Sequence, residues 1–215
     1  QNTDRAVGTR LSHYLYKKFG YNKLPENSCQ INLKGSAGQS LGAFLTKGIK
    51  LIVNGDANDY VAKGLSGGFI VVRPSELSNL SSNENVIVGN TVLYGATNGK
   101  LFASGKAGER FAVRNSGGLA IVEGCGSNGC EYMTGGMTII LGPVGDNFAA
   151  GMTGGISFVY DPKNEFENFV NPQTVIWQTP ETKFWVEKLK KNLEDFYEET
   201  ESKIDQICIS KCMKE

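Results

Sequence analysis

Short apolar runs recur along the middle of the chain, and each follows a tight turn that contains glycine. The runs with their turns are KGIKLIV at 47–53, GGFIVVR at 67–73, NGKLFAS at 98–104, GGLAIVE at 117–123, GGMTIIL at 135–141 and GGISFVY at 154–160. The steps between successive turns are 20, 31, 19, 18 and 19 residues. The step of 31 contains the polar loop PSELSNLSSNEN of 12 residues, and without this loop it is also 19. The pattern therefore indicates an internal repeat with a period of about 19 residues.

A period of this length is typical of one coil of a parallel β-helix. Each unit carries a second short apolar segment before its turn, such as DYVAKG or RFAVRN, so two or three short strands fit into one period. Propeller blades are longer, and the asparagine ladder of leucine-rich repeats is missing. Coils stacked about 4.8 Å apart pair each strand with its neighbours above and below. We therefore predict an all-β core, a parallel β-helix of about six coils.

The columns of the repeat predict which residues are buried, because neighbouring side chains on a strand point to opposite faces. The third residue after each turn is large and apolar, and we assign this column to the core: Leu51, Val71, Phe102, Ile121, Ile139 and Phe158. The fourth column lies on the opposite face and is also apolar: Ile52, Val72, Ala103, Val122, Ile140 and Val159. Our hypothesis is that a helix or a partner domain covers the fourth column on the outer face.

The turn glycines are the candidate functional residues of the repeat, in a structural role. Corners of a coil require positive φ or close approach of two backbones, which glycine allows without strain. We predict this role for Gly48, Gly67, Gly68, Gly99, Gly117, Gly118, Gly135, Gly136, Gly154 and Gly155.

Amphipathic helices are predicted on both sides of the repeat. The segment 3–20 places Val7, Leu11, Tyr14 and Leu15 at helical spacing, and Gly20 is suited to end the helix. A second amphipathic helix, or a pair of helices, is predicted from Thr179-Pro180-Glu181 to about residue 207. Its apolar face carries Trp185, Leu189, Phe196, Ile204 and Ile207. We divide the chain into a β-helix domain with its N-terminal helix, residues 1–161, and a linker with a helical tail, residues 162–215.

Composition and charge narrow the function classes. The 215 residues include 22 Lys and Arg and 22 Asp and Glu, so no basic field exists to attract nucleic acid or an anionic membrane surface. The apolar runs are too short to cross a bilayer, and no signal peptide opens the chain. We expect a cytoplasmic protein, or an organellar one if a targeting segment precedes Gln1. Five cysteines, an odd number spread over long distances, indicate reduced intracellular thiols.

Two features suggest chemistry, and both are better explained by the repeat. Residues 124–129, GCGSNG, have the spacing of a dinucleotide-binding turn, but only CEYMT separates them from the next glycine pair, so no helix fits. Cys125 and Cys130 are too far apart for a usual zinc pair, and His13 is the only histidine. We expect a buried or reduced thiol pair, with a reversible local disulfide as the alternative, and a packing or surface role for His13. We assign no catalytic, cofactor-binding or metal-binding residue.

Charged residues in the turns are a further set of acid–base candidates. They are Asp56, Asp59, Glu109, Glu123, Glu131 and Asp146. Because most of them lie between coils, we expect them to cap backbone amides or to pair with Arg110 and Arg114 rather than to form a catalytic pair.

Several long blocks resemble the C-terminal domain of the glutamate synthase large subunit. They are NTDRAVGTRLS at 2–12, GSAGQSLGAFL at 35–45, GDANDYVAKGLSGGFIVVRP at 55–74, NVIVGNTVLYGAT at 85–97, GKAGERFAVRNSGG at 105–118, GCEYMTGG at 129–136 and NFAAGMTGG at 147–155. The resemblance implies a right-handed β-helix with a glycine-repeat motif. It covers roughly residues 2–160, and the tail resembles the family only weakly.

The resemblance implies a function only through the complete enzyme, which makes glutamate from glutamine and 2-oxoglutarate. In that enzyme a glutaminase domain supplies ammonia to a barrel domain that carries FMN and an iron–sulfur cluster, and an NAD(P)H-oxidising subunit or domain is a further partner. No cofactor is expected in this domain, whose implied role is to pack against the other two and organise them. Alternatives are a contribution of residues to the assembled synthase site or ammonia tunnel, or a glycine-repeat subunit of another redox complex such as formylmethanofuran dehydrogenase.

Overall fold

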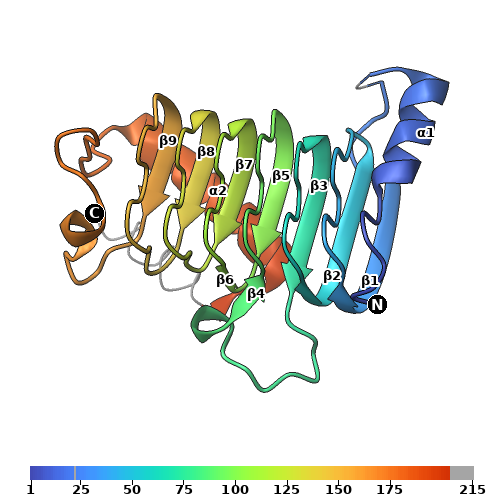
Figure 1. Ribbon diagram of the computed structural model, residues 1–215, viewed down its shortest axis with the longest axis horizontal. Helices are drawn as coiled ribbons and strands as arrows, with labels where there is room; N and C mark the ends of the chain where they lie inside the picture. The colour runs from blue at the N-terminus through green and yellow to red at the C-terminus, as the bar shows by residue number, and fades with distance from the viewer. Residues whose placement is uncertain (22, 204–215) are drawn as a thin grey trace.

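A computed structural model describes residues 1–21 and 23–203. Its elements, in chain order, are α1 (Thr9–Phe19), β1 (Cys29–Ala37), β2 (Ile49–Ala57), β3 (Ser66–Arg73), η1 (Ser82–Glu84), β4 (Val86–Val88), β5 (Asn98–Ala103), β6 (Lys106–Ala107), β7 (Ser116–Val122), β8 (Thr134–Ile140), β9 (Gly154–Val159), η2 (Phe166–Phe169) and α2 (Lys183–Thr200). Most of the chain winds into one stack, with α1 at one end and α2 lying across one side (Figure 1).

The longest side of the stack is a parallel sheet in the order β1-β2-β3-β5-β7-β8-β9 (Figure 1). The chain is therefore a parallel β-solenoid of about seven turns, which confirms the predicted fold class. The turn that the repeat did not reveal is the one containing β1. No glycine occurs in residues 21–28 before Cys29, so the signal used to find the other turns is missing there. The polar loop 74–85 projects from the stack between β3 and β4, as its removal from the repeat implied (Figure 1).

A second side of the solenoid consists of very short parallel pairings. Ala57 at the end of β2 pairs with Val88 of β4, β4 pairs with β6, and Ala107 forms a bridge to Cys125. Most side chains that this side sends inward are small, and they belong to the main hydrophobic core. Cys125 therefore occupies a core position of the repeat.

The third side is a hydrogen-bonded ladder that the sequence did not predict. Alternate residues have positive φ: Tyr60, Ala62 and Gly64; Thr91, Leu93 and Gly95; Arg110, Ala112 and Arg114; Asn128, Cys130 and Tyr132; Asn147, Ala149 and Gly151. Their N–H groups donate alternately to the following and the preceding turn, as when Arg110 donates to Ser127 and Ala112 to Val92. A left-handed conformation costs an L-residue about 1–2 kcal/mol, and here the cross-turn bonds offset that cost.

The strand register corrects our assignment of the buried columns. Phe102, Ile121, Ile139 and Phe158 of the third column lie outside the solenoid, in a separate hydrophobic cluster with Leu193 and Phe196 of α2. The fourth column faces the interior instead, and Val72, Ala103, Val122, Ile140 and Val159 contribute to the main core. In the first repeat Leu51 pairs with Ile70 rather than Val71, so Leu51 is inside and Ile52 is outside. The predicted covering helix exists, but it covers the third column.

The N-terminal helix is shorter than predicted, and the C-terminal segment is interrupted after Thr200. Residues 5–8 extend the ladder, since Ala6 N–H donates to Gln39 O and Gly42 N–H donates to Val7 O, so α1 begins only at Thr9. Gly20 ends α1 as predicted, but Tyr14 is exposed. The second helix ends at Thr200, because Glu201 adopts a left-handed conformation with φ of 57°. Ile204 and Ile207, which we placed on its apolar face, lie outside the described residues.

Candidate functional site

The outer face of the sheet, together with α2, is the part of the molecule where residues distant in sequence converge. From β3 to β9 this face is mainly apolar, whereas on β1 it is polar, with Gln30, Asn32 and Lys34. The helix presents a matching apolar face to the sheet. Trp185 lies at its start, and Leu193 and Phe196 lie near its end, all on this face. Because both surfaces are apolar, docking the helix removes them from water. We call this assembly the helix-covered face.

Aromatic rings fix the position of α2 on the sheet. Phe102 of β5 lies at the centre, with ring centroids 5.1 Å from Phe69 and 5.6 Å from Phe196, both in edge-to-face geometry. Near the other end of the helix, Trp185 packs against Phe158 of β9 at 6.1 Å. Edge-to-face pairs add a directional contribution to burial, so these contacts determine which helical face meets the sheet. The helix therefore runs from β9 back toward β3 and β2.

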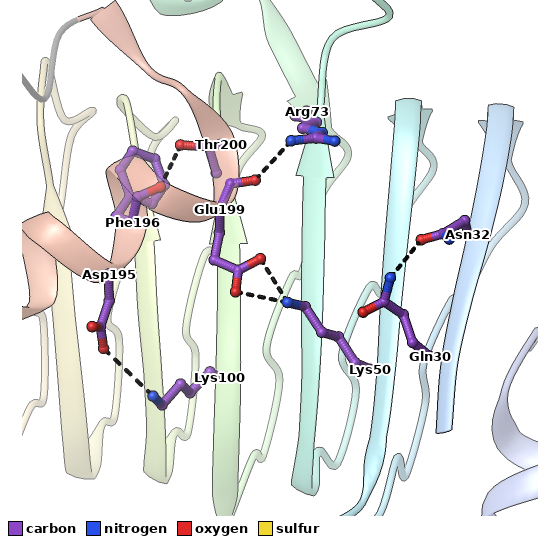
Figure 2. A network of polar contacts seen from close by, with 9 residues as sticks. All are labelled: Gln30, Asn32, Lys50, Arg73, Lys100, Asp195, Phe196, Glu199 and Thr200. Carbon is purple, nitrogen blue, oxygen red and sulfur yellow. Dashed lines mark hydrogen bonds and ion pairs between the residues drawn. The ribbon is translucent and has the colours of Figure 1, made fainter. Parts of the chain in front are cut away.

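Charged groups surround the C-terminal end of α2 (Figure 2). Lys50 Nζ lies 2.6 and 2.7 Å from the carboxylate oxygens of Glu199 and 4.9 Å from the centroid of the Phe69 ring. Arg73 donates through Nε to Asn54 Oδ1 and through its guanidinium to the carbonyl oxygen of Glu199, at 3.1 Å. Two cations thus meet the end of a helix, where the partial charge of the free carbonyls is negative. A third pair, Lys100 with Asp195 at 3.7 Å, is more exposed.

We expect the Lys50–Glu199 pair to contribute measurably to stability, because the Lys50 side chain is only 9% exposed. A double-mutant cycle with Lys50→Met and Glu199→Gln should give a coupling energy of about 1–2 kcal/mol in urea unfolding. The matched control is Lys183 with Glu187, an exposed i,i+4 pair at 3.7 Å, for which about 0.3 kcal/mol is expected. Equal coupling in the two cycles would contradict a special role for Lys50.

Glu123 is fully buried where the chain leaves α2. Its Oε1 accepts hydrogen bonds from Ser104 at 3.0 Å and from Ser202 at 2.5 Å. Its Oε2 has no hydrogen-bond partner in the described part of the chain. Sequence reasoning placed Glu123 among the turn carboxylates, whereas it lies directly after β7 and holds the segment that follows the helix. The sequence held a hint of this role, because Glu123 occupies the same position in its repeat as Arg73 and Ser104. Arg73 binds the carbonyl oxygen of Glu199, and Ser104 binds Glu123 itself.

Cys125 and Cys130 are core residues of the same turn. Cys125 belongs to the side of short pairings, and Cys130 to the ladder; both are buried and free. Burial raises the pKa of Cys125 well above its ordinary value, and the neighbouring Cys130 raises it further. Burial raises the pKa of Cys130 to about 11, although Thr138 and Ser157 hydrogen-bond its sulfur. A raised pKa leaves little thiolate, the reactive form, at neutral pH.

We therefore expect both thiols to resist alkylation in the folded protein. At pH 8, iodoacetamide should modify Cys125 and Cys130 at least about a hundredfold more slowly than in urea, since thiolate and access are both reduced. The rate for Cys130 should rise as the pH approaches its pKa of about 11. Peptide mass mapping over time provides the measurement, and half-buried Cys29 serves as the internal reference. Rapid labelling of Cys130 at pH 8 in folded protein would contradict this assignment.

The other candidates are found in scattered structural roles. Asp59 Oδ1 accepts from the N–H of Asn90 at 2.8 Å, which is the predicted capping role, and Asp56 accepts from Ser36 Oγ at 3.1 Å. His13 is an exposed residue of α1. No group of three or more His, Cys, Asp or Glu that could hold a metal ion occurs among the described residues. Nor does the described part of the chain include a helix long and apolar enough to cross a membrane.

The ten turn glycines lie at the starts of the long strands, and several occupy β-bulges. Between β3 and β5, β7 and β8, and β8 and β9 the register shifts at the glycine pairs. At Gly117, a Cβ would come within 2.1 Å of the carbonyl oxygen of Thr97 in the preceding turn. At Gly136, φ is 79° and a Cβ would lie 2.4 Å from Gly118 O. Both positions combine tight stacking with a local change of register.

Comparison with known proteins agrees with this architecture. The family model of the GXGXG motif matches residues 1–214. The large chain of glutamate synthase [NADPH] from Azospirillum brasilense is 60% identical over 203 residues, which are 94% of this chain and 13% of that protein. The ferredoxin-dependent glutamate synthase of Antithamnion sp. is 50% identical over 197 residues, 92% of this chain and 13% of that protein.

A glutamate synthase [NADH] from Saccharomyces cerevisiae is 61% identical over 135 residues, 62% of this chain and 6% of that protein. The chain thus spans only a small part of the relatives that it matches, 13% of the one from Azospirillum. The chain belongs to the GXGXG motif family and corresponds to the C-terminal glycine-repeat domain of the glutamate synthase large subunit.

Proposed function

We propose that this chain is a non-catalytic part of a glutamate synthase and holds the catalytic domains in their relative positions. The observation that carries the proposal is the continuous stack of parallel turns, linked by backbone hydrogen bonds on the sheet and on the ladder. Such a stack resists bending, because any relative movement of two turns breaks a row of bonds at once. A rigid spacer of this kind suits an enzyme in which separate domains must exchange an intermediate.

The polar groups of the helix-covered face support the same role. Lys50 binds the carboxylate of Glu199 and Arg73 binds its backbone carbonyl oxygen, so the two sheet cations hold the helix in place. We propose that the FMN and the iron–sulfur cluster implied by the resemblance are carried elsewhere in the enzyme. The described cysteines do not fit a cluster site: Cys125 and Cys130 are enclosed in the core, and Cys29 lies on β1. The proposed partners are the glutaminase and FMN-barrel domains.

Reconstitution tests the proposal. A large chain that lacks this segment should have little glutamine-dependent synthesis of glutamate from 2-oxoglutarate, and adding residues 1–215 in trans should restore it. Light scattering on the eluted complex reports assembly independently of turnover. Full activity of the shortened large chain alone would contradict the proposal.

The rival proposal, in which the domain supplies residues to the assembled site or to an ammonia tunnel, predicts a different response to surface substitutions. Arg110→Ala on the ladder and Asp56→Asn near the end of β2 remove exposed charges, whereas Asp59 is unsuitable because it caps Asn90. Lost turnover with an intact complex would favour the rival. Unchanged turnover would support the organising role.

A further inference from the structure

Five large aromatic side chains are exposed at the α1 end of the solenoid. Tyr14, Tyr16, Phe19, Tyr21 and Phe44 are 44–58% exposed, and we call them the aromatic patch. Four of them lie on α1 or within two residues of its end, and Phe44 lies on the ladder, where its carbonyl oxygen accepts a hydrogen bond from Ser12 of α1. Monomeric soluble proteins rarely expose several large apolar side chains in one region of their surface. Tyrosine and phenylalanine are instead enriched at the centres of protein interfaces.

The patch is not needed to hold α1 in place. Leu11 and Leu15 pack against the main core from the side of the helix that faces the solenoid. Ser12 Oγ donates to Phe44 O at 2.7 Å and accepts from the N–H of Thr46 at 3.0 Å, and Thr9 Oγ1 donates to Ala43 O at 2.8 Å. The inner face of α1 is therefore anchored by apolar and polar contacts. The exposed aromatic residues are therefore not required to anchor α1 and are available to contact a partner.

Three members of the patch, Tyr16, Tyr21 and Phe44, line a cavity of about 380 Å³ between α1 and the first turns. Its aromatic walls are His13, Tyr16, Tyr21 and Phe44. Thr9 and Ser12 also line it, but their hydroxyls already donate hydrogen bonds to backbone carbonyl oxygens. The aromatic rings and the His13 imidazole are therefore the groups that would contact a bound side chain. A concave site with aromatic walls can receive a protruding apolar side chain, as the central pockets of protein interfaces do.

Positive charge is concentrated around the patch although the whole chain is neutral. Residues 5–25 include Arg5, Arg10, Lys17, Lys18 and Lys23 and contain no acidic residue. Lys18 Nζ lies 6.0 Å from the centroid of the Tyr14 ring and 5.3 Å from that of Phe19, so one of these charges is held over the patch itself. The electrostatic complement of this surface is an acidic one.

We propose that the aromatic patch binds an acidic protein segment that inserts one apolar side chain into the cavity and places carboxylates beside Arg10, Lys17 and Lys18. The proposal rests on the proposed function in one respect: the segment belongs to the rest of the glutamate synthase. A protein fits better than a lipid surface for two reasons. The continuous apolar face of α1 is already used by the core, and a flat bilayer has nothing to fill the cavity.

Photo-crosslinking in the complete enzyme that carries this domain tests the proposal. Benzoylphenylalanine replaces Tyr16 in one variant, Phe19 in a second, and Leu77 in the control, because Leu77 is exposed in the projecting loop far from α1. We expect both α1 probes to link to a peptide of the same enzyme that is rich in Asp and Glu. The double substitution Lys17→Glu and Lys18→Glu should reduce the yield about tenfold, whereas Lys183→Glu on α2 should not change it.

Yields at Tyr16 and Phe19 no higher than at Leu77 would overturn the proposal, and so would an adduct to a peptide without acidic residues. Co-sedimentation with vesicles of phosphatidylcholine and phosphatidylglycerol that the double substitution abolishes would also overturn it, in favour of a membrane surface. The result is separate from the reconstitution assay. If residues 1–215 restore activity and the probes give no adduct, the organising function stands and this docking surface does not.

Discussion

Replacing Gly117 with alanine is expected to lower the free energy of unfolding by about 3 kcal/mol. The new Cβ would come within 2.1 Å of the carbonyl oxygen of Thr97, which belongs to the backbone of the preceding turn. That backbone cannot move aside freely, because the N–H of Thr97 is bonded to Leu65 one turn further back. The clash would therefore separate two turns of the stack rather than shift one side chain. Urea unfolding monitored by circular dichroism measures the change.

Gly95 offers a matched control on the ladder of the same solenoid. Its φ is 62°, but a Cβ there would meet nothing within 4 Å. The equivalent positions in later turns hold Arg114 and Tyr132 with φ of 55° and 53°, so a side chain is tolerated in this conformation. Gly95→Ala should therefore cost only about 1 kcal/mol. If Gly95→Ala were as damaging as Gly117→Ala, tight stacking would not be the reason for glycine at the turns.

Replacing Phe196 with alanine should destabilise the protein by about 3–5 kcal/mol, the range for truncating a buried phenylalanine. Phe196 is fully buried between α2 and the sheet, with its ring against Phe102. The substitution removes a central contact of the helix-covered face and leaves a cavity above Phe102. Local release of α2 should accompany the loss, so backbone amides in Lys183–Thr200 should exchange with deuterium faster than those of β7.

Phe184→Ala is the control for this second prediction. Phe184 lies on the same helix but is largely exposed and contacts only its neighbours Trp185 and Lys188 in the aromatic and cation–π pairs. Its loss should change the free energy of unfolding by less than about 1 kcal/mol. Unchanged amide exchange in α2 of Phe196→Ala would show that the helix is held mainly by its charged end, at Lys50 and Arg73.

The period of the repeat was visible in the sequence because stacking is local and regular. Each turn must return to the same place on the stack, so the steps of 18–20 residues persist and an insertion such as residues 74–85 can only be accommodated as a loop. The turn of β1 escaped detection because Asn27 and Ser28 precede it in place of a glycine pair. The ladder escaped for a different reason: positive φ at Tyr60, Leu93 or Arg110 contradicts the conformational preference of those residues.

The period, the parallel stacking, six of the turns and the amphipathic helix near the C-terminus could all be predicted from the sequence. The sequence could not decide which apolar column faces inward, since alternation assigns Phe102 and Ala103 to opposite faces and both are apolar. Only the tertiary structure decided this, by docking α2 on one face and joining Lys50 to Glu199 across 149 residues. The physical reason is that periodicity records which residues avoid water, whereas the surface that excludes the water depends on contacts between segments far apart in the chain.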